Sequence, residues 1–293
     1  MRTACVYHRS DLDGFCSAAI VREACPEIVE LIPMEHGDPI PWDLLQEMER
    51  VYVVDFSLAP FEESMQRLKA IVPEVIWIDH HKTAIDTAQA CNLDFPGKQA
   101  CGKAACELCW EYFFDGAVAI PKPVWLLGRY DVWDLNADPR IEHFQLGMQA
   151  QEKANPLHPE SEAFWTDVFF ADSDFVDSRV CEGKSIMAHR QSTYRMYQQQ
   201  AHTLRFEGAN WVALNTQKTG SKVFEGIYNP ELHHGCIAYF RSPSGKWVVS
   251  LYSLDNLHDL SVIAKKHGGG GHASACGFAL ESSQFDLFIR DGM

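Results

Sequence analysis

The feature that most constrains this chain is a short β-branched apolar run, residues 75–78, that stops at Asp79, His80 and His81. The carboxyl ends of strands in an α/β sheet open onto the crevice where ligands bind, so polar groups placed there are positioned for chemistry. A strand that only filled a core would need none of these three side chains. An isolated run of this kind would also fit a capping Asp beside two surface histidines, so the functional interpretation requires other polar residues to converge on the same edge.

Three further apolar runs lead to acidic or imidazole side chains. The runs are residues 4–7, 51–54 and 124–130, and they lead to His8, Asp11 and Asp13, to Asp55, and to Asp131. Each of these positions is where a strand is expected to end. The runs at 4–7, 28–32, 51–54 and 75–78 alternate with segments of helical periodicity, which predicts a parallel sheet with helices on both faces. The carboxyl edge of that sheet should then hold His8, Asp11, Asp13, Asp55 and His80 together.

Beyond residue 134 the pattern changes. A long polar stretch with helical spacing covers residues 176–203, and strand-like runs follow at 209–215, 236–241 and 247–252. A chain of 293 residues exceeds the usual size of one domain. We therefore predict an α/β chain with a parallel-sheet domain over 1–172, a connecting helix over 173–205, and a smaller domain with a mixed sheet over 206–293.

The order of these motifs resembles a known family. The run Gly268-Gly269-Gly270-Gly271-His272 lies near the end of the chain, after His8, Asp11-Leu12-Asp13-Gly14, Asp55, Asp79-His80-His81 and Asp131. Together they resemble the DHH phosphoesterases that carry a DHHA1 C-terminal domain. The resemblance implies a metal-dependent phosphoesterase, with a catalytic DHH domain followed by a substrate-binding DHHA1 domain.

By this resemblance two divalent ions are held by a defined set of ligands: His8 and Asp11 for one, Asp13, His80 and Asp131 for the other, and Asp55 between them. Asp79 would orient a histidine, and His81 would reach the phosphoryl oxygens or help to protonate the leaving oxygen. Mixed imidazole and carboxylate ligation favours Mn²⁺ over Mg²⁺, with Mg²⁺ or Co²⁺ as substitutes.

The second domain would supply the substrate contacts. Four consecutive glycines can form a flexible hinge, but followed by a histidine and small residues they resemble a phosphate cradle. The resemblance assigns substrate binding to Gly269, Gly270, Gly271 and His272, and also to Ser253. Tyr252 stands where many relatives have an arginine, so a nucleotide at this position would be bound by stacking rather than by charge.

Within the family, the chain is most similar to the hydrolases of short oligonucleotides, the nanoRNases that produce mononucleotides. Three alternatives remain open. The first is a 3′-phosphatase acting on adenosine 3′,5′-bisphosphate, and the second is a phosphodiesterase of linear or cyclic dinucleotides. The third, from a different class, is a nucleotide-binding sensor without catalysis, which retained nucleotide binding in the absence of turnover would reveal.

Charge and composition limit the partners. The formal net charge of −15 disfavours tight binding of long duplexes, because such binding neutralises many phosphates with basic residues. Short oligonucleotides and nucleotide phosphates remain compatible as substrates, and a homodimer is an open expectation. The chain passes from Met1-Arg2-Thr3 directly into a strand-like run, and no apolar stretch approaches the length of a membrane span. We therefore expect a cytoplasmic protein with reduced cysteines.

One cysteine pattern allows two interpretations. The spacing Cys101-x4-Cys106-x2-Cys109 matches that of plant-type iron–sulfur proteins. The fourth ligand is not obvious, since the next cysteine is Cys181. Residues 99–114 also fit an amphipathic helix that places Cys106 and Cys109 on one side. We favour buried thiols on a helix.

Overall fold

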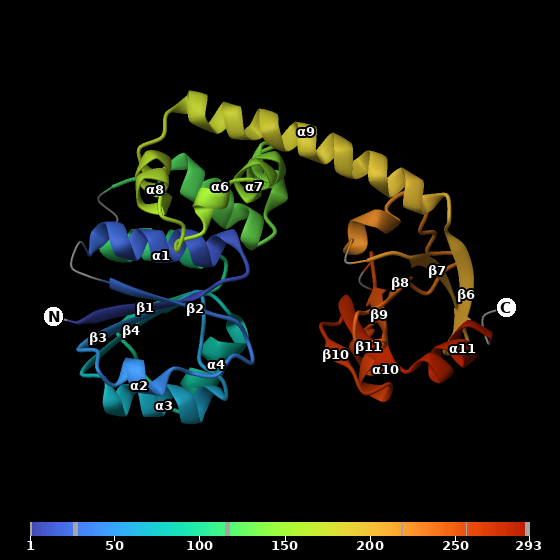
Figure 1. Cartoon of the computed structure of the whole chain (residues 1–293), viewed down its shortest axis with the longest axis horizontal. Helices are drawn as coiled ribbons and strands as arrows, with labels where there is room; N and C mark the ends of the chain where they lie inside the picture. The colour runs from blue at the N-terminus through green and yellow to red at the C-terminus, as the bar shows by residue number, and fades with distance from the viewer. Residues whose placement is uncertain (1, 26–28, 115–117, 218, 256, 291–293) are drawn as a thin grey trace. The chain divides into compact units, whose positions relative to one another are not determined.

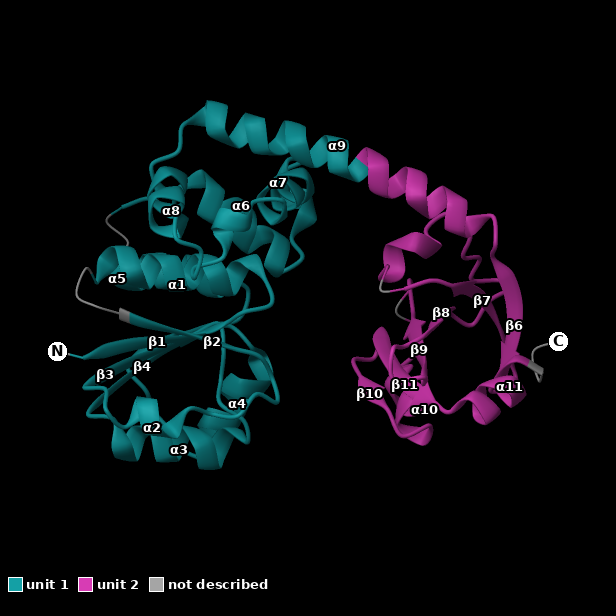
Figure 2. Ribbon diagram, in the orientation of Figure 1, with its two compact units in different colours: residues 1–187 teal, residues 188–293 magenta. Residues whose placement is uncertain are grey.

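The computed structural model describes residues 2–25, 29–114, 118–217, 219–255 and 257–290. The chain forms two compact units, Met1–Met187 and Ala188–Met293 (Figure 2). Helix α9, Ser173–Gln198, begins in the first unit and ends in the second. It ends seven residues before the predicted limit at residue 205, because residues 202–206 form a strand. Within the described ranges, no helix has both the length and the apolar character needed to cross a membrane.

The first unit is built on a five-stranded sheet in which every neighbouring pair is parallel, in the order β2-β1-β3-β4-β5 (Figure 1). The strands are β1 Thr3–His8, β2 Val29–Met34, β3 Arg50–Val54, β4 Glu74–Asp79 and β5 Gly97–Gln99. The prediction of a parallel sheet is confirmed. The predicted strand over 28–32 begins at Ile28, which lies outside the described residues, and the described strand extends to Met34.

Helices cover both faces of this sheet, as Figure 1 shows. In β1, Cys5 and Tyr7 pack into the core on one face, while Ala4 and Val6 pack into the core on the other. This alternation explains why the strands are apolar throughout, since successive side chains point to opposite faces. The first core includes helices α1 Leu12–Ala24, α5 Ala105–Phe113, α6 Lys122–Asp131, α7 Ile141–Gln149 and α8 Ser161–Phe169. The second includes α2 Trp42–Leu45, α3 Phe61–Ile71 and α4 Lys82–Ala90.

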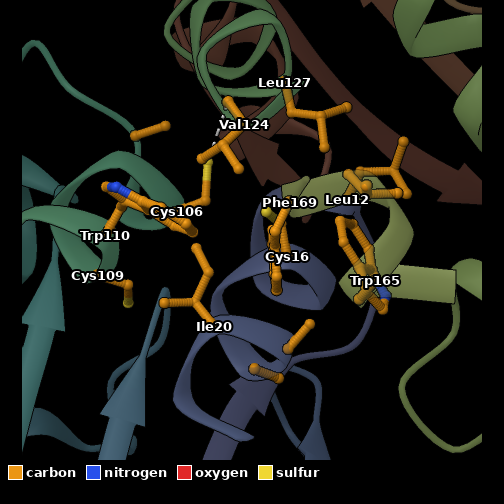
Figure 3. Packing of buried hydrophobic residues seen from close by; sticks show 14 of the residues in the cluster. Leu12, Cys16, Ile20, Cys106, Cys109, Trp110, Val124, Leu127, Trp165 and Phe169 are labelled. Carbon is orange, nitrogen blue, oxygen red and sulfur yellow. Dashed lines mark hydrogen bonds between the residues drawn. The ribbon is translucent and has the colours of Figure 1, made fainter. Parts of the chain in front are cut away.

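The cysteines of α5 belong to the first core. Figure 3 shows Cys106 and Cys109 among Ile20, Trp110 and Val124. Both thiols are fully buried, and Cys106 Sγ donates a hydrogen bond to the carbonyl of Val124 at 3.7 Å. The interpretation as buried thiols on a helix is therefore confirmed for Cys106 and Cys109.

The expected helix over 99–114 is wrong in its first half, and the third cysteine of the pattern, Cys101, is exposed. Residues 97–99 pair with β4 instead, and Gly102 turns the chain with a φ of +87° before α5 begins at Ala105. A positive φ is accessible to glycine at little steric cost, which makes Gly102 suited to separating the strand from the helix.

The expectation that residues 124–130 form a strand that ends at Asp131 is also wrong. They form α6, and Asp131 is its last residue. The sequence does indicate a helix here, because Pro121 and Pro123 flank its first position, and proline is favoured at the start of a helix. The side chains of Val124 and Leu127 are buried one turn apart, which is helical rather than strand spacing.

The second unit contains a six-stranded mixed sheet in the order β10-β11-β9-β8-β7-β6, in which β7 and β8 are parallel and the other neighbours antiparallel. Its elements are β6 His202–Phe206, β7 Ala209–Asn215, β8 Cys236–Arg241, β9 Trp247–Tyr252, α10 Ser261–Lys266, β10 Gly270–Gly271, β11 Ala275–Leu280 and α11 Ser282–Arg290. Short 3₁₀ helices occur at Leu135–Ala137, Glu152–Ala154 and Ser221–Phe224. The mixed sheet predicted for this part of the chain is confirmed.

Candidate metal centre

Eight predicted residues of the first unit gather at the carboxyl edge of the parallel sheet. His8 ends β1, Asp55 follows β3, and Asp79 ends β4. Their potential ligand atoms form three overlapping groups, within each of which all atoms lie within 4.8 Å of one another: His8, Asp11 and Asp55; Asp13, His80 and Asp131; and Asp55, Asp79, His80 and His81. Parallel strands bring these side chains together because all their carboxyl ends meet at one edge.

Asp55 stands between two of these groups. Its Oδ1 atom lies 3.2 Å from Nε2 of His80, and its Oδ2 atom lies 3.7 Å from Nδ1 of His8. The carboxylate is buried, and the backbone has a φ of +51°. Asp is among the few residues that adopt this left-handed conformation readily, and such backbone outliers cluster at functional sites. The two oxygens of Asp55 are thus directed to two different imidazoles.

His8 is held by carboxylates at both ring nitrogens. Nδ1 lies 2.7 Å from Oδ2 of Asp11, and Nε2 lies 3.3 Å from Oε1 of Glu35. Asp11 is also the N-cap of α1, where its Oδ1 atom accepts the backbone N–H of Gly14 at 2.9 Å. Glu35 was not predicted, because it follows β2 in a loop that carries no part of the motifs. Its contact with His8 fixes which imidazole nitrogen faces the cluster.

Asp13 lies in the first turn of α1 and is almost fully buried. Its two carboxylate oxygens accept the backbone N–H groups of Ala105 and Cys106 at 2.8 and 2.7 Å. These two amides belong to the first turn of α5, where helical N–H groups have no partner within the helix. Asp13 therefore joins α1 to α5, while its Oδ2 atom also lies 3.6 Å from Nε2 of His80.

Asp79 is fully buried and organises the two histidines that follow it. Its Oδ1 atom accepts the backbone N–H groups of His80 and His81 at 2.7 and 3.2 Å, and Nδ1 of His81 lies 2.7 Å from the same oxygen. This leaves Nε2 as the nitrogen of His81 able to act on another group. His80 directs its own Nε2 atom to Oδ2 of Asp131 at 3.3 Å.

Electrostatic effects in this cluster are large. Burial raises the pKa of Asp13 and of Asp55 to about 8, and the pKa of Asp131 to about 7. The hydrogen bond with Asp11 raises the pKa of His8 to about 11, and the one with Asp79 raises the pKa of His81 to about 9. Burial also acts to raise the pKa of Asp11, but its bond with His8 outweighs this effect and the pKa is lowered.

These observations fit a bound divalent cation. In the described part of the chain, the ion-pair partners of Asp13, Asp55 and Asp131 are histidines rather than lysine or arginine. Buried carboxylates without such partners resist ionisation, which a cation among them would reverse. The donor set of imidazoles and carboxylates is one that Mn²⁺, Zn²⁺ and related ions accept.

Two further residues that were not predicted, Glu107 and Arg129, connect the helices next to this edge of the sheet. The guanidinium of Arg129 pairs with the carboxylate of Glu107, and both side chains are largely buried. Glu107 also accepts the backbone N–H of Ala104 at 3.1 Å and so caps α5. Because Arg129 lies on α6 two residues before Asp131, the pair connects the helix of Asp131 to the helix that Asp13 caps.

The remaining predicted residues lie in the second unit. Gly270 and Gly271 form β10, which pairs with Gly277 and Cys276 of β11. A Cβ atom at Gly271 would lie 2.6 Å from Cα of Cys276, whereas one at Gly270 would meet nothing within 4 Å. Packing therefore requires glycine at 271 but not at 270.

Gly269 is equally constrained, since a Cβ atom there would lie 2.0 Å from the carbonyl oxygen of Gly277. Exposed His272 donates its backbone N–H to the carbonyl of Ala275 at 2.8 Å. Gly270 and Gly271, together with Tyr252, line a shallow depression of about 440 Å³ on this sheet. The structure thus brings three of the residues singled out in the sequence to one place.

Ser253 is buried, and its hydroxyl donates a hydrogen bond to Oδ1 of Asp255 at 3.0 Å. The other oxygen of Asp255 accepts the hydroxyl of Tyr228 at 2.6 Å. Neither Tyr228 nor Asp255 was predicted. Their bonds hold the Ser253 hydroxyl within the loop that follows β9.

Comparison with known proteins agrees with this geometry. Residues 3–125 match the family model described as the DHH family, N-terminal domain. A protein of Acanthamoeba polyphaga mimivirus that carries the description uncharacterized is 24% identical over 294 residues, covering 94% of this chain and 66% of the relative. The chain therefore spans slightly less than two thirds of the length of that relative.

Two solved structures share the fold at low sequence identity. The pGpG-specific phosphodiesterase of Vibrio cholerae is 13% identical, with a TM-score of 0.56, and the match covers 98% of this chain and 96% of that protein. An exopolyphosphatase-related protein of Bacteroides fragilis is 14% identical, with a TM-score of 0.51, and the match covers 99% of this chain and 92% of that protein.

The parallel sheet, the Asp-His-His cluster at its carboxyl edge and the match over residues 3–125 are those of the N-terminal domain of the DHH family. The first unit of this chain carries the N-terminal domain of that family.

Proposed function

We propose that this chain is a divalent-metal-dependent phosphodiesterase that hydrolyses short oligonucleotides, including dinucleotides, to mononucleotides. The observation that carries the proposal is the position of Asp55, whose Oδ1 and Oδ2 atoms are directed to His80 and His8 respectively. One carboxylate between two sets of ligands is the arrangement that a pair of metal ions requires.

In this proposal His8 and Asp11 hold one ion, Asp13, His80 and Asp131 hold the other, and Asp55 contributes one oxygen to each. Mn²⁺ is the ion that this mixture of imidazole and carboxylate donors favours, with two ions per chain. Bound there, such ions acidify water and neutralise charge on a phosphoryl group. The protein contributes the fixed positions of these ligands, which the strand ends and the cap of α1 supply.

Asp79 and His81 would take part in proton transfer. Asp79 accepts from Nδ1 of His81 at 2.7 Å and so fixes the ring and its tautomer. Nε2 of His81 is then available to contact a phosphoryl oxygen or to give a proton to the leaving oxygen of the ester. The His81 side chain is 46% exposed, which lets a substrate reach it.

The second unit would bind the substrate. We propose that it is a DHHA1 domain in which Gly269, Gly270, Gly271 and His272 contact a phosphate and Ser253 contributes a hydroxyl. Gly270 suits this role best, because it is exposed and nothing in the fold occupies the place of its missing Cβ. Backbone N–H groups at glycine can approach an anion closely.

Two observations support a short substrate. The net charge of −15 disfavours the binding of long polyanions. The fold is shared with a phosphodiesterase that is specific for pGpG, a linear dinucleotide. A linear dinucleotide is therefore the first substrate to test.

Product analysis by chromatography tests this function. The protein would be incubated with Mn²⁺ and, separately, with a diribonucleotide, a five-nucleotide RNA, a long single strand, adenosine 3′,5′-bisphosphate and a cyclic dinucleotide. We expect mononucleotides from the two short RNAs, with the long strand largely intact. Turnover of the bisphosphate alone would instead define a 3′-phosphatase, and turnover of the cyclic dinucleotide alone would define a cyclic dinucleotide phosphodiesterase. Binding without any turnover would define a sensor.

A further inference from the structure

An exposed tryptophan lies beside the metal cluster. The side chain of Trp133 is 61% exposed, and in the part of the chain that the structure describes only Phe170 is another Phe, Trp or Tyr with such high exposure. Large aromatic side chains are ordinarily used to bury apolar surface. An exposed indole two residues from Asp131 of the candidate active site is open to contact with a bound substrate.

The backbone of Trp133 makes this placement more unusual. Its φ is +59°, a left-handed conformation that bulky residues rarely adopt. Trp133 occupies the position just beyond the end of α6: its N–H donates to the carbonyl of Tyr130 at 3.0 Å, and the N–H of Asp134 donates to the carbonyl of Arg129 at 2.8 Å. This pair of bonds is the Schellman closure of a helix, in which the left-handed position is usually glycine.

A glycine would close α6 without strain, so the helix itself gives no reason for an indole at this position. Strained residues of this kind persist where the side chain has a function. The ring of Tyr130 meets that of Trp133 edge to face, with 5.7 Å between the centroids. The closure of the helix fixes the backbone of Trp133, and the indole packs against the ring of Tyr130.

The position is within reach of a bound substrate. Asp131, two residues earlier, directs its Oδ2 atom to within 3.3 Å of Nε2 of His80 in the metal cluster. Since consecutive Cα atoms are about 3.8 Å apart, the Cα atoms of Trp133 and Asp131 are separated by at most about 7.6 Å. A nucleobase is joined to its phosphate through a ribose, so it lies at a comparable distance from a phosphodiester bound at the cluster.

We propose that Trp133 is the base-stacking residue of the active site, contacting a nucleobase of the substrate whose phosphodiester lies at the metal cluster. This inference rests on the proposed function and specifies its substrate. Stacking on an indole accepts any of the bases, because every base presents a π face. Trp133 would thus select for nucleotides over phosphoesters without a base while tolerating different sequences.

Two substrates and three variants test the inference. The substrates are diadenylate and an abasic dinucleotide with the same sugar–phosphate backbone. The variants are Trp133→Ala, Trp133→Phe and, as a matched control, Phe170→Ala, which removes the exposed aromatic side chain at the end of α8. Thermal unfolding of each variant confirms that it is folded, and calorimetry measures the Kd of a non-hydrolysable methylene-bridged analogue of diadenylate.

With diadenylate, Trp133→Ala should raise KM, and the Kd of the analogue, about tenfold or more with kcat changed less than about threefold. Trp133→Phe should recover most of the loss, and Phe170→Ala should behave as wild type. With the abasic dinucleotide, kcat/KM should be the same in wild type and Trp133→Ala. An unchanged KM in Trp133→Ala, or an equal loss on both substrates, would overturn the inference alone. If the wild-type protein cleaves neither substrate, the proposed function fails and this inference fails with it.

Discussion

Nε2 of His80 lies 3.2 Å from Oδ1 of Asp55, although the two residues follow different strands. Strands β3 and β4 are neighbours in the parallel sheet, so their carboxyl ends place the two side chains side by side. The other oxygen of Asp55 faces His8, the last residue of β1, and β1 flanks β3 on its other side. The position of Asp55 in the middle of the sheet is therefore what allows one carboxylate to serve two sets of ligands.

Asp79→Asn should reduce both catalysis and stability. Oδ1 of Asp79 accepts three N–H groups, while its Oδ2 atom is buried without a hydrogen-bond partner within the described structure. An amide nitrogen at the Oδ2 position would be a buried donor without an acceptor, which costs about 1–3 kcal/mol of unfolding free energy. Because His81 loses its charged partner, we expect turnover to fall about 10- to 100-fold, as for other groups that orient active histidines.

Urea unfolding and initial rates with Mn²⁺ measure the two effects of Asp79→Asn. Asp86→Asn is the matched control, since Asp86 pairs with exposed Lys82 on α4 and takes no part in the cluster. Activity within twofold of wild type in Asp79→Asn would contradict the role given to this carboxylate.

The metal-free protein should lose stability as the pH rises. The pKa values of Asp13 and Asp55 are raised to about 8 and that of Asp131 to about 7, above the value of about 3.9 for an unfolded Asp. The folded state therefore binds these protons more tightly, and the stability they contribute is full below pH 4 and is lost as the pH rises towards 8. The raised pKa values of His8 and His81 act in the same direction at higher pH.

Metal binding displaces these protons, so the rise in Tm on adding Mn²⁺ should grow between pH 5.5 and pH 8. Thermal unfolding with and without Mn²⁺ over this range checks the prediction. A Tm increase that is constant with pH, or that shrinks as the pH rises, would contradict it.

Arg129→Met should destabilise the first unit by about 3–5 kcal/mol, because the Glu107 carboxylate would remain buried without its ion partner. Lys103→Met removes the partially exposed pair with Glu111 and should cost less than about 1 kcal/mol. Urea unfolding of the metal-free variants provides both values. The double variant Glu107→Gln, Arg129→Met should recover part of the loss. An Arg129→Met variant as stable as wild type would refute the prediction.

Substitution by alanine should affect stability differently at the two adjacent glycines of β10. Gly271→Ala would place a Cβ atom 2.6 Å from Cα of Cys276 at a φ of +130°, so the second unit should lose more than about 1 kcal/mol of stability. Gly270→Ala meets no atom within 4 Å and should leave the fold intact. If the glycine run contacts a phosphate, Gly270→Ala should nevertheless raise KM for a diribonucleotide several-fold. Unchanged KM in a folded Gly270→Ala variant would remove this residue from the proposed substrate contacts.

The sequence predicted the strand ends well and the surrounding contacts poorly. His8, Asp55 and His80 could be placed because an apolar run of four or five residues before a polar group has few structural interpretations in an alternating chain. Asp131 was assigned to the right cluster from the wrong element, since residues 124–130 are apolar enough to suggest a strand while Pro121 and Pro123 begin a helix.

The contacts made by Glu35, Arg129 and Asp255 could not be predicted. Each links positions that are distant in sequence or lies outside the motifs, as with Glu35 and His8, which are 27 residues apart. Such contacts depend on loop geometry, and no periodic pattern encodes them. The strained backbone of Trp133 is likewise visible only in the structure.

Equilibrium dialysis with metal analysis counts the Mn²⁺ ions bound by the wild-type protein and by Asp55→Asn, and so tests the two-metal site. We expect two ions per chain in the wild type and in the control Asp86→Asn. In Asp55→Asn we expect one ion or fewer, with dinucleotide hydrolysis reduced about a thousandfold or more, because the carboxylate of Asp55 directs one oxygen to each set of ligands. A wild-type protein that saturates at one ion, or an Asp55→Asn variant that retains two ions and near-normal turnover, would contradict the two-metal site.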